Sequence, residues 1–105
     1  MIILSEWVKA CNLEQVKEGQ LFRFVHDDKK LLLANVKGNI HATDLICTHA
    51  DADLSTGFLS DEGIRCPLHL SVFNLDNGEP QNLPAEIPLK VYNVKIDDKE
   101  IYVEL

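Results

Sequence analysis

The chain has 105 residues and a mass of 11.8 kDa, the size of one domain, which leaves no room for a separate catalytic domain. Hydrophobic residues make up 46% of the chain and charged residues 26%, as is ordinary for a globular protein, and this argues against disorder. Ten Lys and Arg against seventeen Asp and Glu give a net charge of -7. Nucleic acid is therefore excluded as a partner, because phosphate binding needs a basic face.

The apolar runs are too short to cross a membrane. The longest are Met1–Leu4 and Leu31–Ala34, whereas a spanning helix needs about 20 apolar residues. No basic segment precedes Met1–Leu4, so the start does not resemble a signal peptide. We therefore expect a soluble, cytoplasmic protein.

Turn signals at short intervals separate segments of strand length. Near the start, Asn12 and Gln15 can cap a short helical turn over Leu13–Val16 that Gly19 ends. Strands are then expected over Leu21–His26, Lys30–Val36, Ile40–Ile46 and Ser71–Leu75, the last leading into a turn at Asn77-Gly78. At the end, alternating apolar and polar residues over 92–96 and 101–105 predict a hairpin with one buried face. One helical turn among hairpins predicts an all-β fold, an antiparallel sandwich or small barrel.

Two regions interrupt this pattern of hairpins. Residues 47–65 are rich in turn formers, and residues 79–88 contain Pro80, Pro84 and Pro88, which cannot occupy a central strand. Long irregular segments on a β scaffold often carry the function.

The first irregular region lies between two pairs of metal-binding residues. Cys47 and His49 precede it, and Cys66 and His69 follow it, which gives the pattern C-x-H-x16-C-x2-H. Two thiolates and two imidazoles suit a tetrahedral zinc ion or a [2Fe–2S] cluster with two Cys on one iron and two His on the other. Each pair mixes ligand types, whereas structural zinc sites usually offer two thiolates per knuckle, so the spacing favours two adjacent metals. A zinc-stabilised interaction module with the same four ligands remains the alternative.

This motif resembles that of the Rieske-type [2Fe–2S] proteins, in particular their small soluble ferredoxins. Phe73, Asn77-Gly78-Glu79, the proline segment and the terminal hairpin extend the resemblance along nearly the whole chain. The resemblance implies one Rieske domain over residues 1–105, built from antiparallel sheets. It also implies a two-loop cluster-binding subdomain at about residues 46–75, with the proline segment packed over the cluster.

The resemblance also assigns the ligands and the function. It implies that Cys47 and Cys66 ligate the inner iron of one [2Fe–2S] cluster, and that His49 and His69 ligate the outer iron that accepts the electron. The chain would then be a monomeric one-electron carrier, not an enzyme, that passes electrons from a reductase to a terminal oxygenase. A cluster-free subunit of a larger reductase is disfavoured because all four ligands are present.

Four positions depart from the Rieske proteins of respiratory and photosynthetic complexes or match them only in part. Ala52 and Leu68 replace two cysteines that form a disulfide in those relatives, so that disulfide is absent here. Ser71 matches a serine that donates a hydrogen bond to the cluster, but Phe73 replaces a tyrosine donor. Fewer donors to the sulfurs predict a potential in the lower part of the Rieske range of about -150 to +300 mV.

The remaining candidates have simpler interpretations. We expect His26 and His41 to be core or surface histidines and Cys11 to be a small buried side chain. Between residues 51 and 65, the acidic residues are either a solvated loop or an acidic rim that steers the carrier to a basic partner. These residues are Asp51, Asp53, Asp61 and Glu62. Pro67, Leu68 and Leu70 would add a small apolar contact for that partner.

Overall fold

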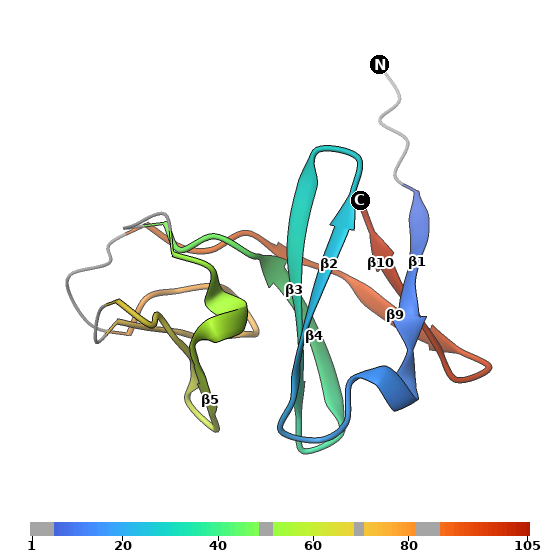
Figure 1. Cartoon of the computed structure of the whole chain (residues 1–105), viewed down its shortest axis with the longest axis horizontal. Helices are drawn as coiled ribbons and strands as arrows, with labels where there is room; N and C mark the ends of the chain where they lie inside the picture. The colour runs from blue at the N-terminus through green and yellow to red at the C-terminus, as the bar shows by residue number, and fades with distance from the viewer. Residues whose placement is uncertain (1–5, 49–51, 69–70, 82–86) are drawn as a thin grey trace.

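The structure is a computed structural model that describes residues 6–48, 52–68, 71–81 and 87–105 (Figure 1). The described residues form antiparallel sheets with the strand orders β1-β10-β9, β2-β3-β4-β8 and β5-β6-β7. The strands are β1 (Trp7–Asn12), β2 (Leu21–His26), β3 (Lys29–Val36), β4 (Asn39–Asp44), β5 (Phe58–Ser60), β6 (Gly63–Arg65), β7 (Val72–Phe73), β8 (Val91–Tyr92), β9 (Val94–Asp97) and β10 (Glu100–Glu104). Two 3-10 turns, η1 (Leu13–Gln15) and η2 (Leu54–Thr56), are the helical elements of the described ranges. The predicted all-β class with antiparallel sheets is confirmed.

Strand β3 lies between two hydrophobic cores. Its residues Leu31 and Leu33 belong to the core that contains β1 and β10, whereas Leu32 and Ala34 belong to the core that contains Cys47 and Cys66. Successive side chains of a strand point to opposite faces, so one apolar run can serve both cores. In Figure 1 the sheet of β2, β3 and β4 accordingly stands between the β1-β10-β9 sheet and the part of the chain that holds β5.

Asn35, near the end of β3, is one of the few polar residues that are buried in the described part of the chain. Its side-chain amide donates to the Val16 carbonyl (2.8 Å), and its Oδ1 accepts from the Gly38 N–H (2.8 Å). The side chain therefore fixes the end of β3 both to the segment after η1 and to the turn before β4.

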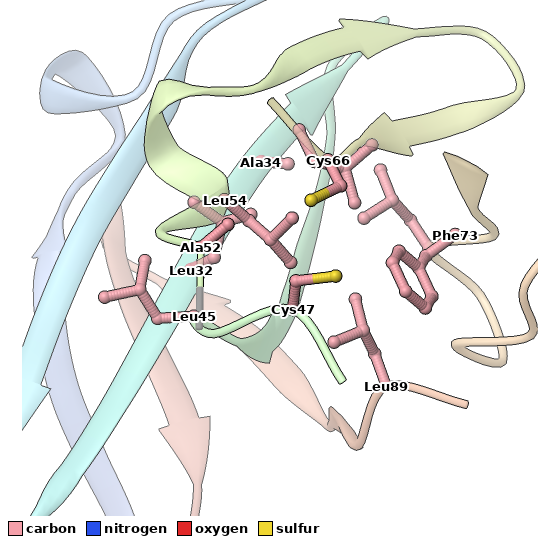
Figure 2. Close-up of a cluster of buried hydrophobic side chains, with 11 residues drawn as sticks. Leu32, Ala34, Leu45, Cys47, Ala52, Leu54, Cys66, Phe73 and Leu89 are labelled. Atoms are coloured by element: carbon pink, nitrogen blue, oxygen red, sulfur yellow. The ribbon is translucent and has the colours of Figure 1, made fainter. Parts of the chain in front are cut away.

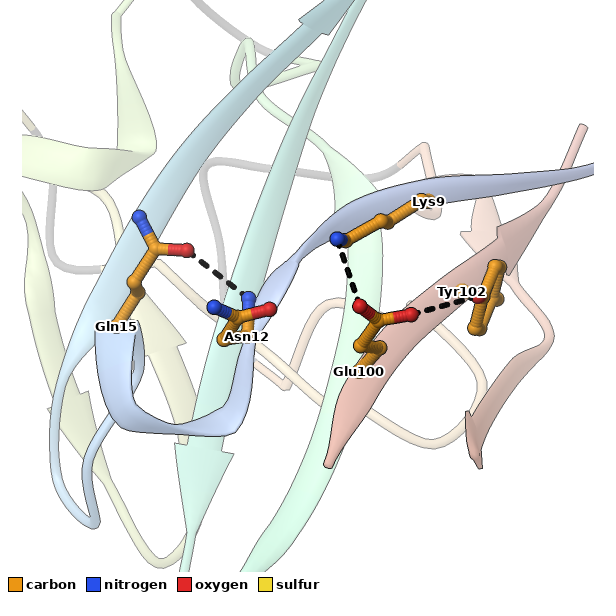
Figure 3. A network of polar contacts seen from close by, with 5 residues as sticks. All are labelled: Lys9, Asn12, Gln15, Glu100 and Tyr102. Carbon is orange, nitrogen blue, oxygen red and sulfur yellow. Dashed lines mark hydrogen bonds and ion pairs between the residues drawn. The ribbon is translucent and has the colours of Figure 1, made fainter. Parts of the chain in front are cut away.

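The early elements agree with the sequence. Strand β2 has the predicted bounds, and β3 begins one residue earlier than predicted. The predicted short helical turn is confirmed as η1, but it ends at Gln15 and not at Gly19. The Asn12 N–H donates to Gln15 Oε1 (2.9 Å, Figure 3).

The predicted terminal hairpin is only partly correct. Its first strand is interrupted at Asn93, because β8 pairs with β4 whereas β9 pairs with β10. Ile96 is 47% exposed, so the expected burial of this side chain is wrong. On the second strand Ile101 and Val103 are fully buried, as predicted.

Three strands were not predicted. Strand β1 pairs with β10, and β5 and β6 form a short hairpin inside the region that we expected to be irregular. Strands β5 and β6 have three residues each, which is too short for an alternating pattern to be recognised in a sequence. Within the described ranges, no helix has the length and apolar character needed to cross a membrane.

The solvent-facing side of the β1-β10-β9 sheet carries a polar network (Figure 3). Lys9 Nζ donates to Glu100 Oε1 (2.8 Å), and the Tyr102 hydroxyl donates to Glu100 Oε2 (2.9 Å). The hydrogen bonds from Lys9 and Tyr102 lower the pKa of Glu100. Trp7 is 39% exposed, and Lys95 Nζ lies 4.6 Å from its ring centroid, so this ring packs at the surface and not in a core.

Candidate metal centre

Two loops, which we call the first arm (residues 46–53) and the second arm (residues 65–72), carry the predicted cysteine ligands. In the first arm the Cys47 N–H donates to the Ala52 carbonyl (3.0 Å). In the second arm the Cys66 N–H donates to the Ser71 carbonyl (3.0 Å). Both arms are therefore closed in the same way, by a bond from the cysteine backbone to the carbonyl five residues later.

The two cysteine side chains meet in one buried apolar group. Cys47 is 4% exposed and Cys66 is 1% exposed, and both belong to the same core. Figure 2 shows their sulfur atoms in the middle of this group, with Leu54 on one side and Phe73 on the other. Neither cysteine is part of a disulfide. Two thiols held close together and away from water are suited to ligate one buried metal.

The predicted histidine ligands, His49 and His69, lie outside the described residues. The structure thus brings two of the four predicted ligands together and does not test the other two. Within the described ranges, no three or more His, Cys, Asp and Glu side chains gather in a group that could hold a metal ion.

One aromatic and one polar residue that follow the second cysteine are fully buried. Phe73 and Ser71 are both 0% exposed, and Phe73 packs in the same core as Cys47 and Cys66. A phenylalanine has no hydroxyl to donate, so this wall of the site is apolar where a tyrosine would supply a hydrogen bond.

Two glycines allow the backbone to approach the site closely. Gly63 has a φ of +142°, and a Cβ there would lie 1.9 Å from the Phe73 carbonyl oxygen. Gly78 has a φ of +78°, and a Cβ there would lie 1.9 Å from the Leu89 carbonyl oxygen. Each position therefore requires glycine, both for the backbone conformation and for space.

The proline segment contacts the site through its described ends. Pro80 forms an isolated bridge with Phe73 outside the named strands, which agrees with the prediction for this proline. At the other end, the Thr48 hydroxyl donates to the Ile87 carbonyl (2.6 Å). Leu89, which follows, is 2% exposed and packs beside Cys47 (Figure 2). Pro84 lies outside the described residues.

The predicted turn at Asn77-Gly78 is wider than a two-residue hairpin turn. The Gly78 N–H donates to the Asn74 carbonyl (2.7 Å), and the Asn74 N–H donates to the Glu79 carbonyl (2.8 Å). Of the two predicted turn residues only Gly78 has a positive φ.

Two of the acidic residues of the region, Asp53 and Asp61, have partners within the protein. Asp53 Oδ1 accepts from the Ser55 N–H (2.8 Å), and Asp53 Oδ2 lies 3.6 Å from Arg23 Nε. Asp61 Oδ2 lies 3.3 Å from Lys37 Nζ. Two of the four acidic side chains are thus engaged within the protein, and Asp51 lies outside the described residues. This weakens the prediction of a steering rim.

The other candidates lie away from the two arms. Cys11 is 5% exposed in the second core, and burial raises the pKa of its thiol, as expected for a packing residue. His26 Nε2 lies 3.6 Å from Asp27 Oδ2, and His41 Nδ1 lies 3.6 Å from Asp76 Oδ1. Both histidines are partly exposed, in agreement with the surface interpretation.

An all-β chain that joins cysteines from two loops in one buried core has the architecture of a two-loop metalloprotein. Residues 6–93 match the Rieske [2Fe–2S] domain, and the chain belongs to this family. The ferredoxin component of the naphthalene 1,2-dioxygenase system of Pseudomonas aeruginosa is 36% identical over 101 residues, which cover 96% of this chain and 97% of the relative.

Solved structures agree with this assignment. The Sphingomonas yanoikuyae B1 ferredoxin has a TM-score of 0.89 at 30% identity, over 95% of this chain and 99% of that chain. A chain in the complex of reduced oxygenase and oxidised ferredoxin of carbazole 1,9a-dioxygenase has a TM-score of 0.87 at 34% identity, over 92% of this chain and 91% of that chain.

The family assignment identifies the cofactor as a Rieske-type [2Fe–2S] cluster. The described donors fit it, because two buried cysteine side chains from separate arms converge in one apolar core. The zinc alternative gains no support from these comparisons. The curated relatives are ferredoxin components and not catalytic subunits, in agreement with the expectation that the chain is a carrier and not an enzyme.

Proposed function

We propose that this chain carries one electron at a time from a reductase to a terminal oxygenase. In this proposal the whole chain, residues 1–105, is one domain, and residues 46–75 form its cluster-binding part. Cys47 and Cys66 ligate the inner iron, and His49 and His69 ligate the outer iron. The bound cluster supplies the redox chemistry by accepting and releasing one electron.

One observation carries the proposal. The Cys47 and Cys66 side chains come from two arms closed by the same backbone bond and end in one apolar group without forming a disulfide. Two cysteine side chains placed together in this way can act as thiolate ligands of one metal. The relatives support the redox role, since their names describe ferredoxin components of oxygenase systems.

The residues around the cysteines set the environment of the electron. Leu54, Phe73 and Leu89 are almost completely buried and keep water from the two sulfurs. Phe73 donates no hydrogen bond, so the electron-rich reduced state receives less stabilisation than it would from a tyrosine. We therefore expect a potential in the lower part of the Rieske range, about -150 to +300 mV.

Exposed apolar side chains beside the arms support a partner surface. Leu68 is 68% exposed and lies in the second arm. Ile87 is 64% exposed, and its carbonyl accepts the Thr48 hydrogen bond from the first arm. A small apolar contact suits a transient redox complex, and the net charge of -7 would speed association with a basic partner.

The proposal is tested by visible and EPR spectra of the purified protein before and after dithionite, with iron, sulfide and zinc measured on the same sample. We expect two irons and two sulfides per chain, a red-brown colour that bleaches on reduction, and a rhombic EPR signal of low average g. One zinc without sulfide in protein made with ample iron would overturn the proposal.

Cysteine variants test the ligand assignment. We expect Cys47→Ser and Cys66→Ser each to abolish the cluster, because a serine hydroxyl replaces a thiolate ligand. Cys11→Ser is the matched control, since Cys11 is equally buried but lies in the other core. Its variant should retain the cluster spectrum. Substitution of His49 or His69 by Gln should abolish the Rieske EPR signal, and a variant that keeps it would remove that residue from the ligand set.

A further inference from the structure

The first arm leaves the sheet at the end of β4, where backbone pairing stops. Strand β4 pairs with β8 through Ala42 with Tyr92 and Thr43 with Val91. The Asp44 N–H continues the ladder by donating to the Lys90 carbonyl (2.9 Å).

Beyond Asp44 the backbone bonds of this chain segment go to other partners. The Leu45 N–H donates to the Lys30 carbonyl (3.0 Å), and Ile46 forms a bridge with Asp53 inside the first arm. The segment that carries Cys47 has therefore left residues 90–92, with which β4 is aligned.

Further along the first arm, the side chain of Thr48 connects the chain to this region again. The Thr48 hydroxyl donates to the Ile87 carbonyl at 2.6 Å, although the two residues are 39 positions apart in the sequence. The Asp44 and Thr48 bonds together hold the chain on both sides of Cys47 against residues 87–90. Two positions from Ile87, the Leu89 side chain is 2% exposed in the core that contains both cysteines.

We propose that Thr48 is a positioning residue whose hydroxyl holds the first arm against residues 87–90 and so keeps Leu89 packed beside Cys47. The consequence for retention of the cofactor rests on the proposed ligation by Cys47. When the bond is absent, Ile87 and Leu89 can move away from the first arm, and water and small solutes reach the sulfur more easily.

The chain offers closely matched variants. Thr48→Val keeps the shape of the side chain but removes the hydrogen-bond donor, whereas Thr48→Ser keeps the donor and removes a methyl group. Thr56→Val is the control, because the Thr56 hydroxyl also donates to a carbonyl, that of Asp53 (2.8 Å), but within its own turn.

The first measurement is the rate at which the loaded protein releases iron to a chelator, followed by visible absorbance. We expect Thr48→Val to release iron about five to ten times faster than the wild type, the size of one lost hydrogen bond. Thr48→Ser and Thr56→Val should remain within about twofold of the wild type. An unchanged rate in Thr48→Val, or an equal acceleration in Thr48→Ser, would overturn the proposal.

The second measurement is independent of the identity of the metal. The Leu89 N–H donates to the Gly78 carbonyl (2.8 Å), so its amide exchange reports whether residues 87–89 stay in place. We expect faster exchange in the peptide that contains Leu89 for Thr48→Val only. Protein that holds zinc in place of iron would refute the proposed function, yet this exchange would still test the role of Thr48.

Failure of a variant to load is also informative. If Thr48→Val alone cannot bind the cluster while Thr48→Ser can, the hydroxyl is needed even for assembly, which supports the proposal. If neither loads, the hydroxyl is not the required feature, and the proposal fails.

Discussion

The two arms are closed by the same backbone bond but are held in place by different means. In the first arm, side chains add to the backbone bridge between Ile46 and Asp53. The Thr48 hydroxyl donates to the Ile87 carbonyl, and Asp53 accepts from Ser55. In the second arm the backbone makes the supporting contacts, because Arg65 pairs with Phe58 and Val72, and Gly63 packs directly against the Phe73 carbonyl.

This difference predicts how each arm responds to substitution. A lost side-chain hydrogen bond costs about 0.5–1.5 kcal/mol, and the remaining contacts can absorb it. A backbone overlap cannot be relieved by rotating a side chain, so strands must separate. We therefore expect graded losses in the first arm and abrupt failure in the second.

The largest effect is expected for Gly63→Ala in β6, the strand that leads into the second arm. A Cβ at this position would lie 1.9 Å from the Phe73 carbonyl oxygen, and the φ of +142° is strained for any other residue. The strain alone costs about 1–3 kcal/mol, and the overlap also pushes β7 away from β6. We expect protein without a bound cluster, measured by absorbance and iron content.

Gly19→Ala is the control for this variant. Gly19 also has a positive φ, +81°, but a Cβ there would meet nothing within 4 Å. It should lose only about 1 kcal/mol of stability and keep the cluster. A Gly63→Ala protein that behaves like Gly19→Ala would remove the distinction between the arms.

Leu89→Ala is expected to have the next largest effect, because Leu89 packs in the core that both arms share. Removing this buried side chain should cost about 3 kcal/mol and leave a cavity beside Cys47. The measurements are the denaturation midpoint and the visible spectrum of the loaded protein.

Leu33→Ala is the matched control, since Leu33 is fully buried but faces the other core. It should lose a similar free energy of unfolding and leave the visible spectrum unchanged. Equal spectral changes in both variants would show that the two cores are not separable environments.

The smallest effect is expected at Asp53 in the first arm. Partial burial raises the pKa of this carboxyl, but the hydrogen bonds from Ser55 and the charge of Arg23 outweigh it and lower the pKa overall. A lowered folded-state pKa stabilises the protein above the unfolded value of about 3.9, and this contribution is lost as the pH falls through the folded-state pKa.

We expect Asp53→Ala to lose about 1 kcal/mol at neutral pH, as is typical for removal of a cap. Asp53→Asn keeps the capping oxygen but cannot titrate. The difference in denaturation midpoint between the wild type and Asp53→Asn should therefore shrink as the pH is lowered from about 6 to about 3. A difference that stays constant over this range would show that the Asp53 charge does not support the first arm.

The sequence predicted continuous strands and the cysteine ligands better than the contacts between segments that are far apart in the chain. Strand β2 was predicted correctly because its apolar and aromatic residues form one uninterrupted segment of strand length. The break at Asn93 could not be predicted, since it depends on β8 joining β4, which lies about fifty residues earlier in the chain. The cysteines of the site were recognised from their spacing, whereas the Thr48–Ile87 contact links positions that no local pattern relates.

Because β3 contributes side chains to two cores, its apolar residues alone do not define its register with the neighbouring strands. Because Leu31, Leu32, Leu33 and Ala34 are all apolar, sliding this strand by one residue would place leucines in both cores again, and hydrophobicity alone would penalise the shift little. Asn35 removes this ambiguity, because its buried amide finds the Val16 carbonyl and the Gly38 N–H only in the observed alignment. Asn35 thus sets the register of the central strand. Through that register it determines which leucine of β3 lies in the core of the cysteines.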